Sequence, residues 1–163
     1  MAKDSSFDVV SQVDMQEMDN AVNQTKKEIA QRYDFRGSDA SIDLEEKCIK
    51  LAAEDEYKLN AIIDMLRARM AKRDIPLRCL ELGKVEPASK GTVRQTLNIL
   101  QGIPKEKAKA IVAAIKAMKL KVTAQMQDDQ VRVSGAKKDE LQAVIQMLKA
   151  GDFGVDLQFI NMR

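Results

Sequence analysis

Apolar and polar residues alternate with a period of two over residues 120–135 and predict a β-hairpin. Residues 120–126 carry an apolar side chain at every second position, and residues 130–134 do so again. Such alternation is typical of strands with one buried face and one face in water. Asp128 and Asp129 interrupt the pattern, so we expect a short polar turn between two antiparallel strands.

The same periodicities divide the whole chain into two halves, each with the element order βαββαβ. The predicted strands cover residues 7–13, 40–44, 49–51, 77–82, 92–100, 120–127, 130–135 and 155–161. Helices with an apolar stripe are predicted to begin near Asp14, Glu54, Pro104 and Lys138. Asp14 followed by Glu17 is typical of the capping residues that open a helix.

The two halves also share residues at a constant offset of 82 positions. Residues 49–51 (IKL) correspond to 131–133 (VRV), and residues 59–66 (LNAIIDML) correspond to 141–148 (LQAVIQML). A shared offset across a strand and a helix indicates an internal duplication. The predicted fold class is therefore α+β, with two tandem ferredoxin-like (RNP-like) domains. Each would be a four-stranded antiparallel sheet with two helices on one face.

The predicted domain boundary lies in a polar segment near the middle of the chain. Residues 84–91 (KVEPASKG) contain proline, serine and glycine, a composition typical of linkers and turns. We therefore expect a first domain at residues 1–85 and a second at residues 86–163. The strand at residues 92–100 could also pair with an edge of the first half or with another chain, so a homo-oligomer is one prediction.

Composition indicates the cellular compartment of the protein and whether its two thiols form a disulfide. Apolar residues make up 45% of the chain and charged residues 32%, which suits a soluble globular protein. Ala2–Ser6 shows no signal-peptide pattern, and no apolar run would span a membrane, so a cytoplasmic location is predicted. Cys48 and Cys79 would lie about 9–10 Å apart on non-adjacent strands, too far for a disulfide.

The chain contains no histidine, which excludes several classes of site. Serine–histidine and cysteine–histidine nucleophile systems are ruled out, as are histidine-ligated metal sites. No paired carboxylates or phosphate-binding glycine loop are present either. We predict a non-catalytic protein with no metal and no cofactor.

Charge is divided unevenly between the two halves. Residues 1–85 have a net charge of −3, from 14 basic and 17 acidic residues, and residues 86–163 have a net charge of +5, from 13 basic and 8 acidic residues. A basic half permits phosphate binding without requiring it.

The open sheet face of the second half is the first candidate binding site. It is predicted to carry Arg94, Thr96, Lys121, Thr123, Gln125, Arg132 and Gln158. Cations can hold phosphates, and amides and hydroxyls can bond to base edges and sugars. No aromatic residue lies on the two central strands, so binding would depend on phosphates and would fall steeply with salt. The alternative is an ordinary solvated sheet face.

The segment RYDFRG at residues 32–37 is the second candidate. Tyr33 and Phe35 alternate there with Arg32 and Arg36. Arg36 could hold a phosphate while one ring stacks on a base. The alternative is that both rings close the end of the core while the arginines pair with neighbouring aspartates.

A basic helix at residues 105–119 is the third candidate. It carries Lys105, Lys107, Lys109, Lys116 and Lys119. Such a run is usually the solvated face of a helix, and contact with a nucleic-acid backbone is the alternative.

Five separated motifs closely resemble the bacterial YajQ family. They are SFDVVS (6–11), RYDFRG (32–37), QDDQVRVSG (127–135), DELQAVIQ (139–146) and LQFINMR (157–163). The resemblance implies two tandem ferredoxin-like domains in a cytosolic nucleotide-binding protein. Members of the family have been associated with purine nucleotides, tRNA and cyclic di-GMP.

The predicted function is non-catalytic binding of a purine nucleotide, such as ATP or GTP, or of an RNA such as tRNA. The predicted site combines the residues of the open sheet face with Tyr33, Phe35 and Arg36. The alternative is a cyclic di-GMP sensor that acts through a protein partner.

Overall fold

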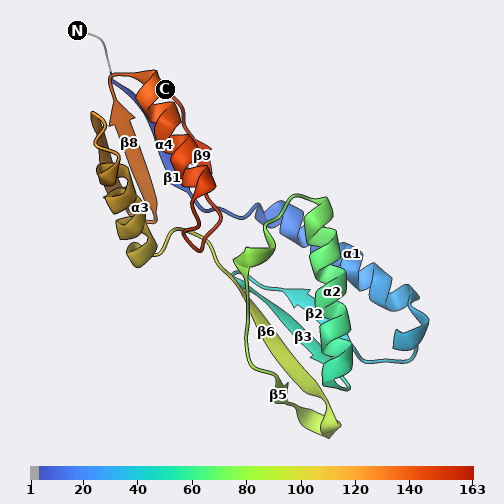
Figure 1. Cartoon of the computed structure of the whole chain (residues 1–163). Coiled ribbons are helices and arrows are strands. Elements are labelled where there is room, and N and C mark those ends of the chain that lie inside the picture. The colour runs from blue at the N-terminus through green and yellow to red at the C-terminus, as the bar shows by residue number, and fades with distance from the viewer. Residues whose placement is uncertain (1–3) are drawn as a thin grey trace. The chain divides into compact units, whose positions relative to one another are not determined.

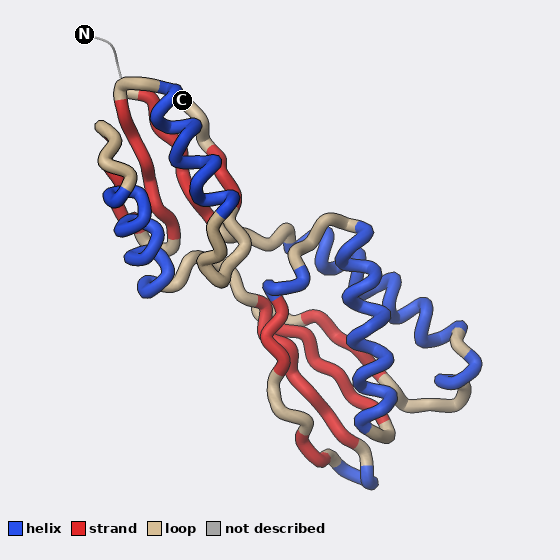
Figure 2. The backbone as a smooth tube through the Cα atoms, viewed as in Figure 1, coloured by secondary structure: helices blue, strands red, loops and turns tan. Residues whose placement is uncertain are grey.

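A computed structural model describes residues 4–163, so part of the Ala2–Ser6 segment lies outside the described residues. Figure 2 shows helices and strands alternating along the chain. In chain order the elements are β1 (Ser5–Val10), α1 (Met15–Gln31), η1 (Tyr33–Phe35), β2 (Ser41–Leu44), β3 (Cys48–Ala53), α2 (Glu56–Lys72), η2 (Leu77–Cys79), β4 (Leu80–Leu82), β5 (Glu86–Pro87), η3 (Ser89–Gly91), β6 (Val93–Ile99), α3 (Lys105–Ala117), β7 (Val122–Gln127), β8 (Gln130–Gly135), α4 (Lys138–Ala150) and β9 (Gln158–Ile160).

The chain forms two compact units, and it passes between them twice. Unit 1 combines the residues up to Gln12 with Gln101–Arg163, and unit 2 is Val13–Leu100. Each unit has its own antiparallel sheet and its own pair of long helices (Figure 1). The predicted α+β fold class with ferredoxin-like units is therefore confirmed.

Unit 1 contains the sheet β7-β8-β1-β9, in which every pairing is antiparallel. The strand β1 lies between β8 and β9, so the amino-terminal strand pairs with strands from the other end of the chain. Phe7 and Val9 of β1 face the helices and are fully buried with apolar residues of α3, α4 and β8. The edge-on contact of Phe7 with Phe159 of β9, at 6.0 Å between ring centroids, joins the last strand to this core.

Unit 2 contains the sheet β2-β3-β6-β4, with the short strand β5 also paired to β6. Here β6 lies between β3 and β4, the place that the first strand occupies in a βαββαβ unit. Leu97 of β6 is fully buried with Ile49 of β3 and with apolar residues of α1 and α2. The helix α1 begins as predicted, because the Asp14 side chain accepts hydrogen bonds from the backbone N–H groups of Gln16 and Glu17.

The predicted division at residue 85 differs from this arrangement, because the first strand of each predicted half lies in the sheet of the other unit. The segment predicted to be a linker is instead the loop of a β4–β6 hairpin, held by a 2.8 Å bond from Gly83 N–H to the Thr96 carbonyl. Strands close in sequence pair readily. Alternation identifies a strand, but it does not specify which long-range partner the strand takes.

The two cysteines lie as expected from the strand order. Cys48 is on β3, Cys79 precedes β4, and β6 separates these two strands. Cys48 and Cys79 are not joined by a disulfide.

Substitution of Phe7 tests the strand arrangement. Phe7→Ala removes a fully buried ring from unit 1, so we expect unit 1 to lose about 3–5 kcal/mol of unfolding free energy. Native-state hydrogen exchange should then accelerate in β8 and stay unchanged in β3. Leu97→Ala is the matched control and should accelerate exchange in β3 instead. Acceleration in β3 caused by Phe7→Ala would contradict the arrangement.

Candidate functional site

The open face of the unit 1 sheet carries five of the predicted site residues. Thr123 and Gln125 are exposed on β7, and Gln125 lies directly opposite Arg132 of β8. Gln158 is on β9, and Lys121 immediately precedes β7. These five residues therefore belong to one unit.

The cation at the centre of this face, Arg132, is bound by a carboxylate that sequence analysis did not predict there, that of Asp8. Asp8 of β1 lies opposite Arg132 and is almost fully buried. Its carboxylate accepts hydrogen bonds from Arg132 Nε at 2.8 Å and Nη2 at 3.2 Å, and from Asn161 Nδ2 at 2.7 Å. The bonds from Arg132 lower the pKa of Asp8, and those to Asp8 raise the pKa of Arg132. The Arg132 guanidinium is therefore committed to a structural ion pair.

Gln158 is also engaged within the protein. Its amide nitrogen donates to the Gln12 carbonyl at 2.8 Å and to the Asp156 carboxylate at 3.2 Å. The side chains of Lys121, Thr123 and Gln125 remain exposed on this face. The face therefore keeps a cation, Lys121, beside two uncharged polar groups.

Arg94 and Thr96 lie on β6 and belong to the unit 2 sheet, a different sheet from that of the other five residues. Arg94 Nε is 3.3 Å from Glu86, and Lys50, which lies opposite Thr96, is 3.4 Å from Glu45. The structure therefore divides the predicted sheet-face site between two sheets. Each of these cations on the unit 2 face has a carboxylate neighbour.

The RYDFRG segment forms a short 3₁₀ turn at the end of α1, and its two rings have different environments. Phe35 is buried, with 4% of its surface exposed, whereas Tyr33 is 84% exposed. Arg32 binds Asp34 through two hydrogen bonds of 2.9 and 2.7 Å, and its guanidinium lies 5.5 Å from the Phe35 ring centroid. Phe35 and Arg32 therefore have the structural roles that the alternative interpretation predicted.

Arg36 and Tyr33 form the part of this segment that is not used by the fold. The Arg36 guanidinium carbon lies 5.6 Å from the Tyr33 ring centroid. Within residues 4–163, no carboxylate forms an ion pair with Arg36. An exposed ring beside an uncommitted guanidinium can stack on a base while the guanidinium binds phosphate oxygens in a bidentate manner.

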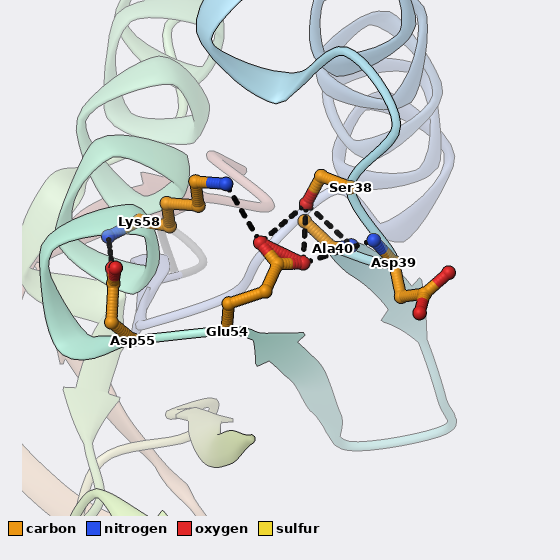
Figure 3. A network of polar contacts seen from close by, with 6 residues as sticks. All are labelled: Ser38, Asp39, Ala40, Glu54, Asp55 and Lys58. Carbon is orange, nitrogen blue, oxygen red and sulfur yellow. Dashed lines mark hydrogen bonds and ion pairs between the residues drawn. The ribbon is translucent and has the colours of Figure 1, made fainter. Parts of the chain in front are cut away.

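A hydrogen-bond network centred on Glu54 holds the chain that follows Arg36 (Figure 3). The Glu54 carboxylate accepts from Ser38 Oγ at 2.6 and 2.7 Å, from the Asp39 backbone N–H at 2.9 Å and from Lys58 Nζ at 2.8 Å. Ser38 Oγ in turn accepts from the Ala40 backbone N–H at 3.0 Å. These bonds connect the loop to the start of α2. They therefore hold in place the backbone that follows the Arg36–Tyr33 pair.

The chain's other tyrosine, Tyr57, is a second exposed ring of unit 2 that sequence analysis did not single out. It lies in the first turn of α2, is 76% exposed, and directly precedes Lys58. The hydrogen bonds to Asp34 raise the pKa of Arg32. The signal in the sequence was weak, because a single tyrosine on a polar helix turn has no spacing that points to a ligand.

A family model described as "Nucleotide-binding protein YajQ-like" matches residues 5–163. The chain belongs to the YajQ family. The matched range contains all five motifs from which the resemblance was inferred, and it includes strands of both units.

Several YajQ-family relatives match over nearly their whole length. One from Syntrophotalea carbinolica is 60% identical over 158 residues, or 97% of this chain and 98% of the relative. One from Trichlorobacter lovleyi is 57% identical with the same coverage. One from Carboxydothermus hydrogenoformans is 54% identical over 165 residues, covering 100% of both chains. All three are named nucleotide-binding proteins.

Among residues 4–163, no three acidic or cysteine side chains are grouped so that they could hold a metal ion. No helix in that part of the chain has the length and apolar character needed to cross a bilayer.

The Glu54 network makes the stability of unit 2 depend on pH. The hydrogen bond from Lys58, followed by that from Ser38, lowers the pKa of Glu54 from 4.5 to about 2. A lowered pKa stabilises the folded state above about pH 4.5, and this contribution is lost as the pH falls towards 2. Because the Glu54 side chain is 36% exposed, solvent screening reduces the contribution to about 1 kcal/mol.

We therefore expect Glu54→Gln to lower the unfolding free energy by about 1 kcal/mol at neutral pH and by much less near pH 2. Urea unfolding at the two pH values measures the difference. Glu46→Gln, at an exposed residue outside the network, is the control and should have little effect at either pH. An equal loss at both pH values for Glu54→Gln would contradict the ionic role of this carboxylate.

Proposed function

We propose that this chain is a non-catalytic protein that binds a purine nucleotide or a strand of RNA at Arg36 and Tyr33. The observation that carries the proposal is the Arg36 guanidinium, 5.6 Å from the centroid of a ring that is 84% exposed and with no carboxylate paired to it in the described chain. The names of the relatives support nucleotide binding in general.

Neighbouring charges favour Arg36 over the two arginines of the sheet faces. Arg132 is bonded to Asp8, and Arg94 lies beside Glu86. A phosphate that bound either arginine would compete with a carboxylate already in place, whereas Arg36 requires no such displacement. The guanidinium would bind phosphate oxygens through charge-assisted hydrogen bonds, and Tyr33 would stack on the base.

The ligand class is a prediction that one experiment can resolve. ATP and GTP each present a purine ring and phosphates, as does tRNA in its unpaired regions. Cyclic di-GMP presents the same two groups, and the alternative proposal is that it is sensed here and acts through a protein partner. Cytoplasmic location and self-association also remain predictions.

Removal of either member of the pair should weaken binding. Base stacking on an aromatic ring contributes about 1–3 kcal/mol, so we expect Tyr33→Ala to reduce affinity about tenfold or more. Arg36→Ala should have an effect of similar size, and with RNA it should reduce the salt slope by about one phosphate contact. Fluorescence anisotropy with labelled tRNA, ATP, GTP and cyclic di-GMP at two salt concentrations measures both effects.

Matched variants separate the sites. Tyr33→Phe keeps the ring and should retain most of the affinity. Arg94→Ala tests the unit 2 face, and Thr123→Ala with Gln125→Ala tests the unit 1 face; both should leave affinity within about twofold. If affinity falls with the sheet-face variants and persists without Arg36 and Tyr33, the proposed site is wrong and the predicted sheet-face site gains support.

A further inference from the structure

A groove of about 380 Å³ lies between α3 and β7 in unit 1, whereas the proposed nucleotide site belongs to unit 2. It is lined by Lys109, Val112, Ala113, Lys116, Ala124 and Met126. The four residues from α3 have the spacing i, i+3, i+4 and i+7, so they form one stripe along the helix. Val112 packs against the core, and the stripe borders the buried residues of the same helix.

The strand β7 forms one edge of the unit 1 sheet, since its only strand partner in the described chain is β8. Edge strands of natural proteins usually carry a charge, a proline or a bulge that prevents further pairing. The six residues of β7, VTAQMQ, include no charged residue and no proline, and their pairing with β8 runs without a bulge. Met126 is also 42% exposed at this edge.

The peptide groups at this edge belong to the same residues that line the groove. Asp128 and Asp129 form a two-residue turn, so the flanking Gln127 and Gln130 make the hydrogen-bonded pair that closes the hairpin. Hydrogen-bonded and non-hydrogen-bonded pairs alternate along an antiparallel ladder. The N–H and C=O groups of Ala124 and Met126 therefore point away from β8, and no described turn or loop bonds to them.

The charge of the groove is entirely positive. Lys109 and Lys116 are exposed at its rim, and no acidic residue lines it. Within residues 4–163 neither lysine takes part in an ion pair. An occupant that supplies carboxylates at the rim and an apolar group between them would complement both the charge and the lining.

We propose that this groove binds an extended acidic segment of a partner protein, which adds a strand to the edge of β7. Main-chain hydrogen bonds to Ala124 and Met126 would hold the strand, and one apolar side chain would enter the groove between α3 and β7. Lys109 and Lys116 are seven residues apart, or about 10 Å along the helix. In an extended segment, acidic residues two positions before and two positions after the apolar residue are about 14 Å apart. The long lysine side chains can cover the difference between these two spacings.

A protein segment fits the groove better than a nucleic-acid backbone does. A phosphate backbone would use the two lysines, but it would leave the lining of Val112, Ala113, Ala124 and Met126 without an apolar partner. It would also leave the outward peptide groups of β7 unpaired. A strand with one apolar residue satisfies the lysines, the lining and the peptide groups together.

Peptide titration of the ¹⁵N-labelled full chain tests the proposal. The probe is a seven-residue peptide with a central leucine, a glutamate two positions to each side, and threonine elsewhere. We expect amide shifts to be largest at Val122, Ala124 and Met126. Lys109→Glu combined with Lys116→Glu should weaken binding about tenfold. A peptide with lysines in place of the glutamates should bind the unsubstituted chain at least as weakly as the glutamate peptide binds this double variant.

Two further variants distinguish strand addition from general charge attraction. Lys27→Glu with Lys47→Glu makes the same charge change at exposed lysines of unit 2 and should leave peptide binding unchanged. Ala124→Pro removes an N–H that points to the free edge, a place where proline is tolerated in sheets, and should abolish peptide binding while β8 stays protected from hydrogen exchange.

Three results would overturn the proposal. The first is an absence of shifts at the β7 amides with millimolar peptide, and the second is shifts that are largest elsewhere. The third is tighter binding of a labelled single-stranded RNA than of the peptide, with the same two lysines required, which would make α3 a nucleic-acid contact.

Discussion

The pairing of β1 with β8 and β9 is the interaction on which the unit 1 fold depends. Three of the four strands of this sheet follow residue 120, but their central partner is Ser5–Val10. Without β1, the buried residues of β8 would lose Phe7 and Val9 from their core, and β9 would lose its only strand partner in the described chain. Unit 1 therefore cannot be completed until the carboxyl-terminal part of the chain is present.

The insertion of unit 2 between β1 and α3 carries a modest entropic cost. Loop-closure entropy grows only with the logarithm of loop length, by about 0.6 kcal/mol for each doubling. Because Val13–Leu100 folds around its own core, the inserted segment joins the ends of unit 1 as a structured body. In unit 2 the central position is filled by β6, which reaches it through the β4–β6 hairpin. Each sheet thus obtains its central strand, although from an unexpected part of the chain.

The distribution of paired and unpaired cations distinguishes surfaces that maintain the fold from surfaces open to ligands. Arg132, Arg94, Arg32 and Lys58 each lie beside a carboxylate. The ion pair of Asp8 with Arg132 joins β1 to β8 and helps to place the amino-terminal strand. Arg36, Lys109 and Lys116 have no such partner in the described chain. Net charge gave no indication of this division, because it counts paired and unpaired cations alike.

The sequence by itself determined the identities of the elements, the faces of the strands and the duplication. Alternation at residues 120–135, the cap at Asp14 and the constant offset between 59–66 and 141–148 are local or repeated signals, and their elements are present in the structure. Local backbone preference and the need to bury one face account for this success. The RYDFRG motif likewise drew attention to Arg36 and Tyr33.

Only the tertiary structure decided which strands became neighbours and which candidate side chains remained available. Strand pairing is a long-range choice, and one residue range with the correct alternation can complete either sheet. The exchange of β1 and β6 between the predicted halves places Arg94 and Thr96 on a different sheet from Lys121 and Gln125, and it brings Asp8 against Arg132. The motif alone does not distinguish the two aromatic residues Phe35 and Tyr33. In the structure Phe35 is a core residue, whereas the ring of Tyr33 is exposed.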